Sequence, residues 1–260
     1  MNLSFFKSRI GSKLGLDMAS YNERHLERRL LIRMRALKIS TYGEYLRYLN
    51  RNPEEIAKLK EVLTVNVTEF LRNPETYKVF RDIVIPELFS RKKNIKIWSA
   101  GCSDGKEPYS IAILILDFLK GNVDKFNVKI IASDIDDDVL NKAKIGWYPE
   151  KEFVGEIRKY KRYFIHKNGG YEVKKEIKRL VSFKKIDLLK DGFPLMLDVI
   201  FCRNVIIYFK REAKEALFEK FWGVLNKGGY LILGKTEMLF GKAKNLFVPV
   251  NSTERIYKKP

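Results

Sequence analysis

Residues 95–110 read IKIWSAGCSDGKEPYS: an apolar run, a loop with two glycines, and the start of a second apolar run. In an open parallel sheet the ligand lies beyond the carboxyl ends of the strands, and the first strand-to-helix turn carries glycines that let the backbone approach it. Gly101 and Gly105 occupy such a turn. The loop lacks the signatures of phosphate-binding loops, so its small residues and Glu107 favour a ligand with a cationic group and an amino-acid tail.

After residue 90 the chain alternates between β-rich runs and segments with helical spacing of apolar residues. Strands that are separated by helices form a parallel sheet with helices on both faces. We therefore predict a doubly wound α/β domain over residues 91–260. Its strands are expected at 95–98, 128–133, 198–202 and 230–233, and its helices at 108–119, 137–143 and 211–224.

The N-terminal part of the chain is predicted to be an all-α domain over residues 1–72, because it shows helical periodicity and no convincing strand pattern. A linker helix is expected over residues 73–90. The first predicted helix carries its apolar stripe at Leu26, Leu30, Met34 and Leu37, and two shorter helices are expected at 42–49 and 53–63.

A small antiparallel β insertion is predicted at about residues 151–182 of the α/β domain. There the two candidate strands, 160–165 and 171–173, flank the triplet Asn168-Gly169-Gly170. Asn-Gly and Gly-Gly supply the positive φ angles that tight hairpin turns need.

Two further strand ends of the α/β domain carry polar side chains. Asp134 ends the second strand, where a carboxylate accepts hydrogen bonds from ribose hydroxyls in nucleoside-binding folds of this kind. Arg203 and Asn204 follow the third strand, so they are predicted to face the same ligand crevice. Tyr208, four residues further on, reads by itself as a core aromatic residue.

The net charge is +19, with 51 basic and 32 acidic side chains, which indicates an acidic partner: nucleic acid, an anionic membrane surface or an acidic protein. Residues 66–150, which contain the glycine loop, carry 13 basic and 13 acidic side chains, so the excess lies on flanking surfaces. One such surface is a basic face between residues 24 and 38. Its candidate docking residues are Arg24, Arg28, Arg29 and Arg33; a plain solvated face is the alternative.

The chain contains two cysteines and two histidines, and these show no metal-ligand spacing, so we expect no metal site. No run of 18 or more apolar residues appears, and the first residues lack the apolar core of a signal peptide. We therefore expect a cytoplasmic protein without direct membrane insertion.

Taken together, six segments of the chain resemble the CheR family of chemotaxis receptor methyltransferases. The family uses S-adenosylmethionine to methylate glutamate side chains of receptors, and leaves S-adenosylhomocysteine as the product. The resemblance covers nearly the whole chain. The matching segments are 66–72, 98–110, 132–136, 146–149, 201–208 and 228–237.

The resemblance implies a methyltransferase that forms glutamyl methyl esters in sensory adaptation, with the cytoplasmic helical domain of a methyl-accepting chemotaxis receptor as partner of the basic face. It implies catalytic, orienting roles for Arg72 and Tyr208. Lys106 and Asp187 depart from the family pattern, which often has Glu and Asn there. The implied cofactor-binding residues are Asn66, Thr68, Arg72, Gly101, Glu107, Asp134, Asp187, Leu188, Arg203 and Asn204.

Two other functions stay open at the level of sequence. A methyltransferase acting on nucleic acid would suit the positive charge, although the strand-end segment of many base methyltransferases is replaced here by Arg203-Asn204-Val205-Ile206. We therefore do not expect nucleic acid as a partner. A regulatory module that senses S-adenosylmethionine without turnover is the non-enzymatic alternative.

Overall fold

The computed structural model describes residues 1–64, 66 and 68–260, and the chain divides into two compact units. Unit 1 comprises Met1–Asn66 together with Tyr208–Lys214, and unit 2 comprises the rest of the described chain. The chain therefore leaves unit 2 after Ile207 and returns to it at Glu215. No pattern in the sequence indicates that the segment Tyr208–Lys214 packs with the N-terminal residues.

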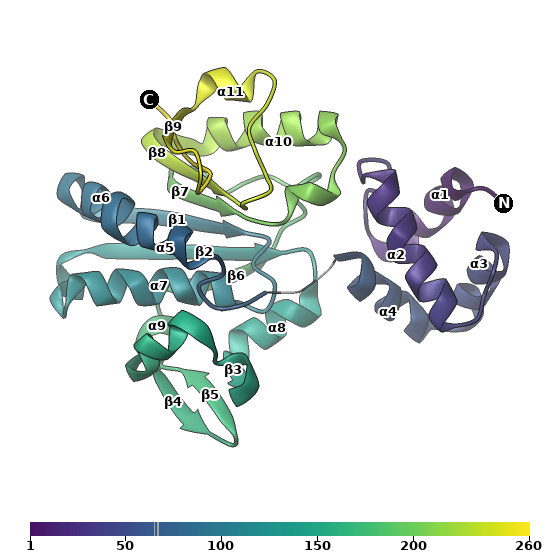
Figure 1. The fold of residues 1–260 in the computed structure, drawn as a ribbon, viewed down its shortest axis with the longest axis horizontal. Helices are drawn as coiled ribbons and strands as arrows, with labels where there is room; N and C mark the ends of the chain where they lie inside the picture. The colour runs from purple at the N-terminus through teal and green to yellow at the C-terminus, as the bar shows by residue number, and fades with distance from the viewer. Residues whose placement is uncertain (65, 67) are drawn as a thin grey trace. The chain divides into compact units, whose positions relative to one another are not determined.

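Unit 1 is helical, as predicted (Figure 1). Helix α1, which was not predicted, buries Phe6 and Leu14. Helix α2 buries Leu26, Leu30 and Met34, which confirms the predicted apolar stripe. The helices are α1 (Leu3–Leu14), α2 (Glu23–Ala36), α3 (Tyr42–Arg51) and α4 (Pro53–Thr64).

Local capping explains where these helices begin and end. The side chain of Asn22 accepts a hydrogen bond from the backbone N–H of His25 at the start of α2. Thr41 and Glu44 form a reciprocal capping box at the start of α3. Gly15 ends α1 in the left-handed conformation, with φ of 68°.

Unit 2 is organised around a seven-stranded sheet with the strand order β6-β2-β1-β7-β8-β10-β9. The first five of these strands are parallel, which confirms the doubly wound prediction for this part of the sheet. The last two, β10 and β9, run antiparallel at one edge and make the sheet mixed. The strands are β1 (Asn94–Ala100), β2 (Asn127–Asp134), β6 (Val181–Lys185), β7 (Leu197–Cys202), β8 (Leu225–Leu233), β9 (Val248–Asn251) and β10 (Ile256–Lys258).

The four predicted strands all lie in the parallel part of the sheet, and β9 and β10 at this edge were not predicted. Only residues 252–255 join β9 to β10. A parallel connection needs a crossover of a dozen or more residues, so a link of this length produces an antiparallel pair. Strand β6 was also not predicted, although Val181 and Phe183 alternate with Ser182 and Lys184.

Helices pack along this sheet (Figure 1). Helix α7 is buried along most of its length, which explains the continuous apolar run after the glycine loop. A π-helical turn, Phe80–Val84, joins α5 to α6. The helices of unit 2 are α5 (Pro74–Val79), α6 (Ile85–Arg91), α7 (Lys106–Leu119), α8 (Asp137–Ile145), α9 (Lys175–Lys178), α11 (Ala243–Leu246) and, from Glu215 onward, α10 (Arg211–Val224), whose first four residues belong to unit 1.

The core of unit 2 occupies both faces of the sheet, because successive side chains of a strand point to opposite faces. On one face Ile97 joins a buried cluster with Phe80 and Phe201, whose rings lie 5.0 Å apart. On the other face Trp98 packs against Phe221, with ring centres 5.7 Å apart.

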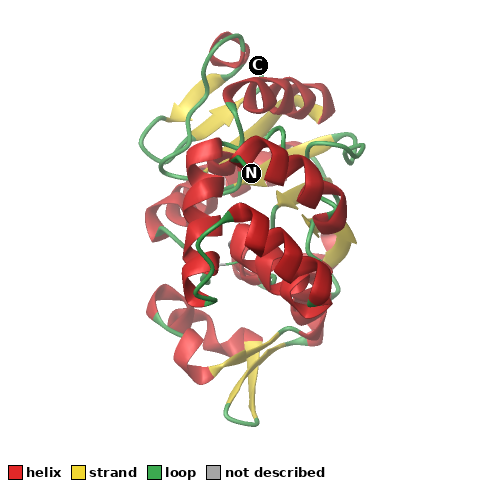
Figure 2. Ribbon diagram, turned by 90° about the vertical axis from the view of Figure 1, so that its right-hand side faces the viewer, coloured by secondary structure: helices red, strands yellow, loops and turns green. Residues whose placement is uncertain are grey.

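A separate three-stranded sheet, β3-β5-β4, forms the predicted antiparallel insertion. Asn168 and Gly169 have φ of 51° and 69°, so the hairpin turn forms where the sequence predicts it (Figure 2). The prediction of a strand over 160–163 is wrong: these residues end the 3-10 segment Gly155–Tyr163, which is kinked at Tyr160 and buries Ile157 and Tyr163. The strands are β3 (Trp147–Pro149), β4 (Phe164–Lys167) and β5 (Gly170–Val173).

Candidate active site

The glycine loop leads from β1 to α7 and is held to the end of β2 by hydrogen bonds. The backbone N–H groups of Gly101 and Cys102 both donate to the carbonyl oxygen of Ser133, each at 2.8 Å. Gly101 has φ of 81°, and a Cβ atom there would lie 2.3 Å from a methyl carbon of Val205. Glycine is required here because the loop after β7 approaches the backbone of the loop after β1.

Asp134 lies at the carboxyl end of β2 with its carboxylate turned into the same loop. Its two oxygens accept hydrogen bonds from the backbone N–H groups of Ser103, at 2.8 Å, and Asp136, at 3.1 Å. The side chain is buried, and burial raises the pKa of the Asp134 carboxyl, although the backbone N–H groups oppose this shift.

Glu107 stands on the first turn of α7, and only 8% of the residue is exposed. One carboxylate oxygen accepts a hydrogen bond from the hydroxyl of Ser99 at 2.8 Å, and the other lies 3.6 Å from the guanidinium of Arg203. Burial raises the pKa of Glu107, and the charge of Arg203 opposes this shift. The structure thus brings together Glu107 and Arg203, which are about a hundred residues apart in sequence.

Arg203 also reaches the segment that precedes α5. Its guanidinium donates to the backbone carbonyl oxygen of Arg72 at 2.7 Å and to the side-chain oxygen of Asn73 at 3.0 Å. It donates to the hydroxyl of Tyr77 at 3.3 Å and lies over the ring of that residue. Sequence reasoning missed Tyr77, which reads as an ordinary apolar position of a helix.

Glu237 holds the loop after β7 and was also missed as a site residue. Its buried carboxylate accepts backbone hydrogen bonds from Asn204, Val205, Ile207 and Gly234 at 2.7–3.3 Å. The signal for it was present, because a lone acidic residue follows the apolar run of β8. Glu237 lies behind the loop and fixes its backbone.

Three buried side-chain atoms of the described residues have no hydrogen-bond partner: Oδ1 of Asp104, Nε of Arg203 and Oδ1 of Asn204. Buried polar atoms normally have partners, so these atoms, on the loops after β1 and β7, are available to a ligand or to water. Carboxylate and amide oxygens suit an ammonium group, and a guanidinium suits a carboxylate. This set fits a ligand that carries both an ammonium group and a carboxylate.

Asp187 and Leu188 follow β6, close to the end of β2. The N–H of Ile186 donates to the carbonyl oxygen of Asp134 at 3.1 Å, which aligns the two strand ends. Leu188 is buried. One carboxylate oxygen of Asp187 accepts a hydrogen bond from Leu189 N–H at 2.9 Å, so this carboxylate stabilises its own turn.

The segment expected to close over the cofactor is divided between the two units. Asn66 belongs to unit 1 and its amide donates to the hydroxyl of Thr64 at 3.3 Å. Thr68 and Arg72 belong to unit 2, where Leu71 adopts a φ of 51° and its N–H bonds to Ser110. Residues 65 and 67 lie outside the described part of the chain.

Tyr208 belongs to unit 1, where the main chain holds it in place. Its carbonyl oxygen accepts the N–H of Asn22, and Lys210 N–H donates to the carbonyl oxygen of Ser20, both at 2.8 Å. Tyr21 pairs with Phe209 between these bonds. The ring of Tyr208 meets that of His25 edge-on at 6.1 Å.

The predicted docking residues on α2 fall into two groups. Arg24 and Arg28 are exposed and Arg29 is half-buried. Arg33 differs, because its guanidinium forms two 2.5 Å hydrogen bonds with the buried carboxylate of Glu55. The charge of Arg33 is compensated inside unit 1.

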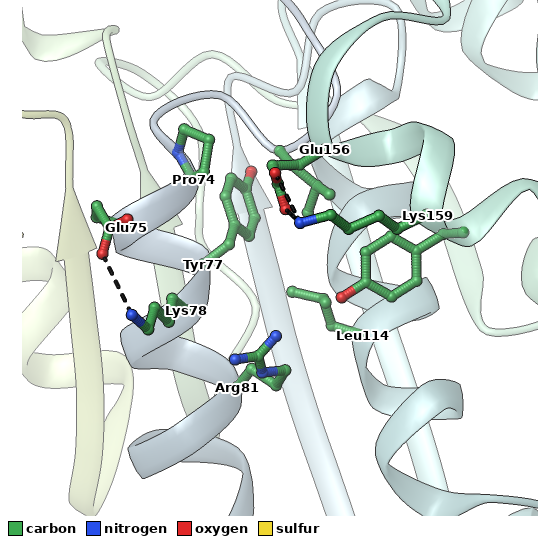
Figure 3. A pocket seen from close by; sticks show the side chains of 10 residues that line it. Pro74, Glu75, Tyr77, Lys78, Arg81, Leu114, Glu156 and Lys159 are labelled. Carbon is green, nitrogen blue, oxygen red and sulfur yellow. Dashed lines mark hydrogen bonds and ion pairs between the residues drawn. The ribbon is translucent and has the colours of Figure 1, made fainter.

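Unit 2 also contains a pocket of about 470 Å³ between α5 and the 3-10 segment Gly155–Tyr163 (Figure 3). Tyr77, Arg81 and Lys159 are among its lining residues, and no predicted site residue is. Lys159 pairs with Glu156 at 2.7 Å on the same 3-10 segment. Tyr77 links this pocket to the strand-end residues, because its hydroxyl accepts a hydrogen bond from Arg203.

Within the described residues, no group of three or more His, Cys, Asp or Glu side chains is arranged to hold a metal ion. Among those same residues, no helix is long and apolar enough to cross a membrane. The two cysteines, Cys102 and Cys202, are both buried and free.

Two family models match the chain. Residues 66–256 match "CheR methyltransferase, SAM binding domain", and residues 1–64 match "CheR methyltransferase, all-alpha domain". The chemotaxis protein methyltransferase of Listeria innocua is 33% identical over 92% of this chain and 90% of its own length. That of Borreliella burgdorferi is 32% identical over 95% and 90%, and chemotaxis protein methyltransferase 2 of Pseudomonas aeruginosa is 35% identical over 95% and 89%.

Proposed function

The chain belongs to the CheR methyltransferase family, and we propose that it transfers a methyl group from S-adenosylmethionine to glutamate side chains of chemotaxis receptors in the cytoplasm. The observation that carries this proposal is that Glu107 and Arg203 face each other at the strand ends. Buried polar atoms of Arg203 and Asn204 without partners suit the polar groups of S-adenosylmethionine. Family membership favours a receptor over nucleic acid as substrate, and turnover over sensing.

We assign each part of the cofactor to different residues at the strand ends. Asp134 accepts from the ribose hydroxyls, using lone pairs that its two backbone hydrogen bonds leave available. Glu107 and Arg203 face the amino-acid end, and Asn204 lies beside them. Leu188 supplies an apolar contact for the adenine, next to Asp187. We assign closure over the cofactor to Asn66, Thr68 and Arg72 in the segment before α5. Gly101 is assigned a contact with the cofactor through its backbone.

When bound, S-adenosylmethionine supplies an electrophilic methyl group on a positively charged sulfur. A glutamate side chain has a reference pKa of about 4.3 and is ionised near neutral pH, so the chain needs no general base. An anion and a cation react to give neutral products, so charge is lost in the transition state. A site that excludes water therefore favours the reaction.

Orientation of the acceptor carboxylate is the remaining task of the protein. Well-oriented groups contribute roughly 7–11 kcal/mol in favourable model systems. We assign this task to Arg72, whose guanidinium can form a bidentate pair with a carboxylate, and to Tyr208, whose hydroxyl can donate to it. Tyr208 suits this role because the main chain around it is fixed by hydrogen bonds to Asn22 and Ser20.

Receptor docking is assigned to the exposed face of α2. Arg24, Arg28 and Arg29 carry positive charge that Glu23 and Glu27 only partly offset. Burial and the charges of Arg28, Lys214, Arg29 and Arg24 lower the pKa of His25 on the same helix. This local positive potential complements an acidic receptor helix.

The test is methyl transfer to a defined acceptor. Purified protein is mixed with methyl-labelled S-adenosylmethionine and receptor cytoplasmic domains that are free of nucleic acid, and base-labile methanol release and peptide masses are measured. We expect label on receptor glutamates, released by base and unaffected by nuclease. Cofactor binding without transfer would leave the sensing alternative, and base-stable label would contradict a glutamyl ester.

A further inference from the structure

Arg72 lies between two residues whose backbone is left-handed. Leu71 has φ of 51° and Asn73 has φ of 58°. A residue other than glycine adopts this conformation only where its surroundings hold it, because the conformation costs free energy, more for Leu than for Asn. Backbone strain of this kind gathers at functional sites. Here it flanks a residue to which we assign orientation of the acceptor carboxylate.

Two neighbouring elements hold this strained backbone. On α7, the hydroxyl of Ser110 accepts a hydrogen bond from the N–H of Leu71 at 3.0 Å. After β7, the guanidinium of Arg203 donates to the carbonyl oxygen of Arg72 and to the side-chain oxygen of Asn73. Asn is a favoured N-cap residue, yet the side chain of Asn73 makes no capping hydrogen bond to α5. Asn73 therefore serves the contact with Arg203 instead of the helix.

A third contact holds the first turn of α5 from a segment far along the chain. The hydroxyl of Thr76 donates to a carboxylate oxygen of Glu254 at 2.7 Å, and the N–H of Thr76 donates to the carbonyl oxygen of Asn73 at 3.0 Å. Both side chains are buried, and the second oxygen of Glu254 pairs with Lys235 at 2.5 Å. Burial would raise the pKa of Glu254, but the hydrogen bonds from Lys235 and Thr76 lower it below its ordinary value. An ionised acceptor thus holds this turn opposite Arg203.

A second contact of the same composition lies between α6 and the C-terminal strands. The carboxylate of Glu87 accepts a hydrogen bond from the hydroxyl of Tyr230 on β8 and pairs with Lys258 on β10 at 2.5 Å. Its other ionic partner is Arg91, one turn further along α6. None of these partners is a predicted site residue. The chain therefore contains two similar contacts, of which only the first bears on the backbone beside Arg72.

We propose that Thr76 and Glu254 are positioning residues for Arg72, and that together with Ser110 they hold the strained backbone from which its guanidinium orients the acceptor carboxylate. This inference rests on the proposed function, because it deepens the role assigned there to Arg72. Loss of one contact lets the backbone beside Arg72 relax, and the guanidinium moves with it. A displacement of about 1 Å can lower the rate of a reaction roughly a hundredfold.

The test is single-turnover methyl transfer from S-adenosylmethionine to receptor cytoplasmic domains. Thr76→Val keeps the branched shape of the side chain and removes the hydroxyl, so it should lower the rate by about tenfold to a hundredfold. Thr76→Ser keeps the hydroxyl and should transfer methyl at nearly the unaltered rate. Tyr230→Phe is the matched control, because it removes the corresponding hydroxyl from Glu87. It should lower the Tm about as much as Thr76→Val does and leave the rate unchanged.

A double variant shows whether the effect passes through Arg72. In an Arg72→Ala background, Thr76→Val should lower the rate little further, because residues that act through one group are not additive. Ser110→Ala, which removes the acceptor of the Leu71 N–H, should behave in the same way and takes the place of Thr76→Val if that variant is not folded.

The assignment is overturned by an unchanged rate in Thr76→Val, by an equal loss of rate in Tyr230→Phe, or by a full additional loss in the Arg72→Ala background. Failure of the unaltered protein to transfer methyl groups to the receptor domains would instead reject the proposed function.

Discussion

Arg203, at the end of β7, donates a hydrogen bond of 2.7 Å to the backbone carbonyl oxygen of Arg72, in the segment that precedes α5. The same guanidinium faces Glu107 on α7 at 3.6 Å. One buried side chain therefore joins the central strand, the helix after the glycine loop and the segment that carries a proposed catalytic residue. Arg203 contacts the main chain of Arg72, and we propose that it also contacts the cofactor.

Replacement of Arg203 by Lys should keep the positive charge and lose most of these hydrogen bonds. A single ammonium cannot reproduce the planar set of donors that reaches Arg72, Asn73 and Tyr77. We expect kcat/KM for methyl transfer to fall by roughly a hundredfold, with weaker S-adenosylhomocysteine binding. Arg81→Lys is the control, because the guanidinium of Arg81 pairs with Asp82 at the exposed face of α5 and the π-helical turn. Similar losses in both variants would contradict this role.

Gly101→Ala should destabilise the protein through a clash with Val205, which a second substitution, Val205→Ala, can relieve. The added Cβ would lie 2.3 Å from a methyl carbon of Val205, at a backbone φ of 81° that side chains disfavour. We expect a loss of about 1–3 kcal/mol from the backbone strain alone, seen as a lower Tm. The double variant with Val205→Ala should recover part of this loss, since it removes the clash.

Gly192→Ala is a suitable control for that experiment, because a Cβ atom added at Gly192 would have no heavy atom within 4 Å and the residue has no positive φ. Its Tm should stay within about 1 °C of the unaltered protein. A double variant no more stable than Gly101→Ala would show that the approach of the two loops is not the cause.

Tyr208→Phe should lower kcat and leave the Kd of S-adenosylhomocysteine unchanged. The substitution removes the hydroxyl assigned to the acceptor carboxylate and keeps the ring that meets His25. Loss of one hydrogen bond to a charged group corresponds to about 1.5–3 kcal/mol, or roughly 10- to 150-fold in rate. Single-turnover methyl transfer measures it, and an unchanged rate would remove Tyr208 from the catalytic set.

Charge reversal on α2 should impair docking alone. Arg28→Glu combined with Arg29→Glu should raise the KM for the receptor several-fold and leave cofactor affinity intact. Added salt should weaken docking of the unaltered protein, because exposed charges are screened over about 8 Å at physiological ionic strength. Lys13→Glu, an exposed charge reversal on α1, controls for net charge. The docking surface is refuted by an unchanged KM in the double variant.

Cofactor binding should release protons and strengthen as the pH rises from the ordinary pKa values of three buried carboxyls towards neutrality. Burial raises the pKa values of Asp104, Glu107 and Asp134 above their ordinary values of 3.8, 4.5 and 3.8. In the free protein the neutral forms therefore persist to higher pH, and stability falls as the pH rises through the raised values. A cationic ligand favours the ionised forms, so binding expels protons in this range.

Calorimetry of S-adenosylhomocysteine in two buffers with different ionisation enthalpies measures that proton release directly. The ligand's own ammonium stays charged over this range, since α-amino groups titrate at about 7.7–8.0. An affinity that does not change with pH, together with equal heats in both buffers, would show that these carboxyls are already ionised in the free protein.

The amino-acid sequence by itself determined the parallel part of the main sheet, the helical N-terminal part, the hairpin at Asn168-Gly169 and the family. These features depend on local patterns: the spacing of apolar residues, turn residues with positive φ, and motifs in a fixed order. The same patterns located the strand ends that carry Asp134, Arg203 and Asn204, because polar residues that follow an apolar strand are visible in one dimension.

Only the tertiary structure decided which polar groups already have partners. Arg33 reads like its neighbours on α2, yet Glu55 from another helix compensates its charge. Glu107 and Asp104 stand three residues apart and look alike in the sequence. Both carboxylate oxygens of Glu107 face a partner, Ser99 or Arg203, whereas Oδ1 of Asp104 has no hydrogen-bond donor among the described residues. Hydrogen bonds and ion pairs of this kind join residues distant in sequence. Their presence depends on burial and distance, which no local pattern encodes.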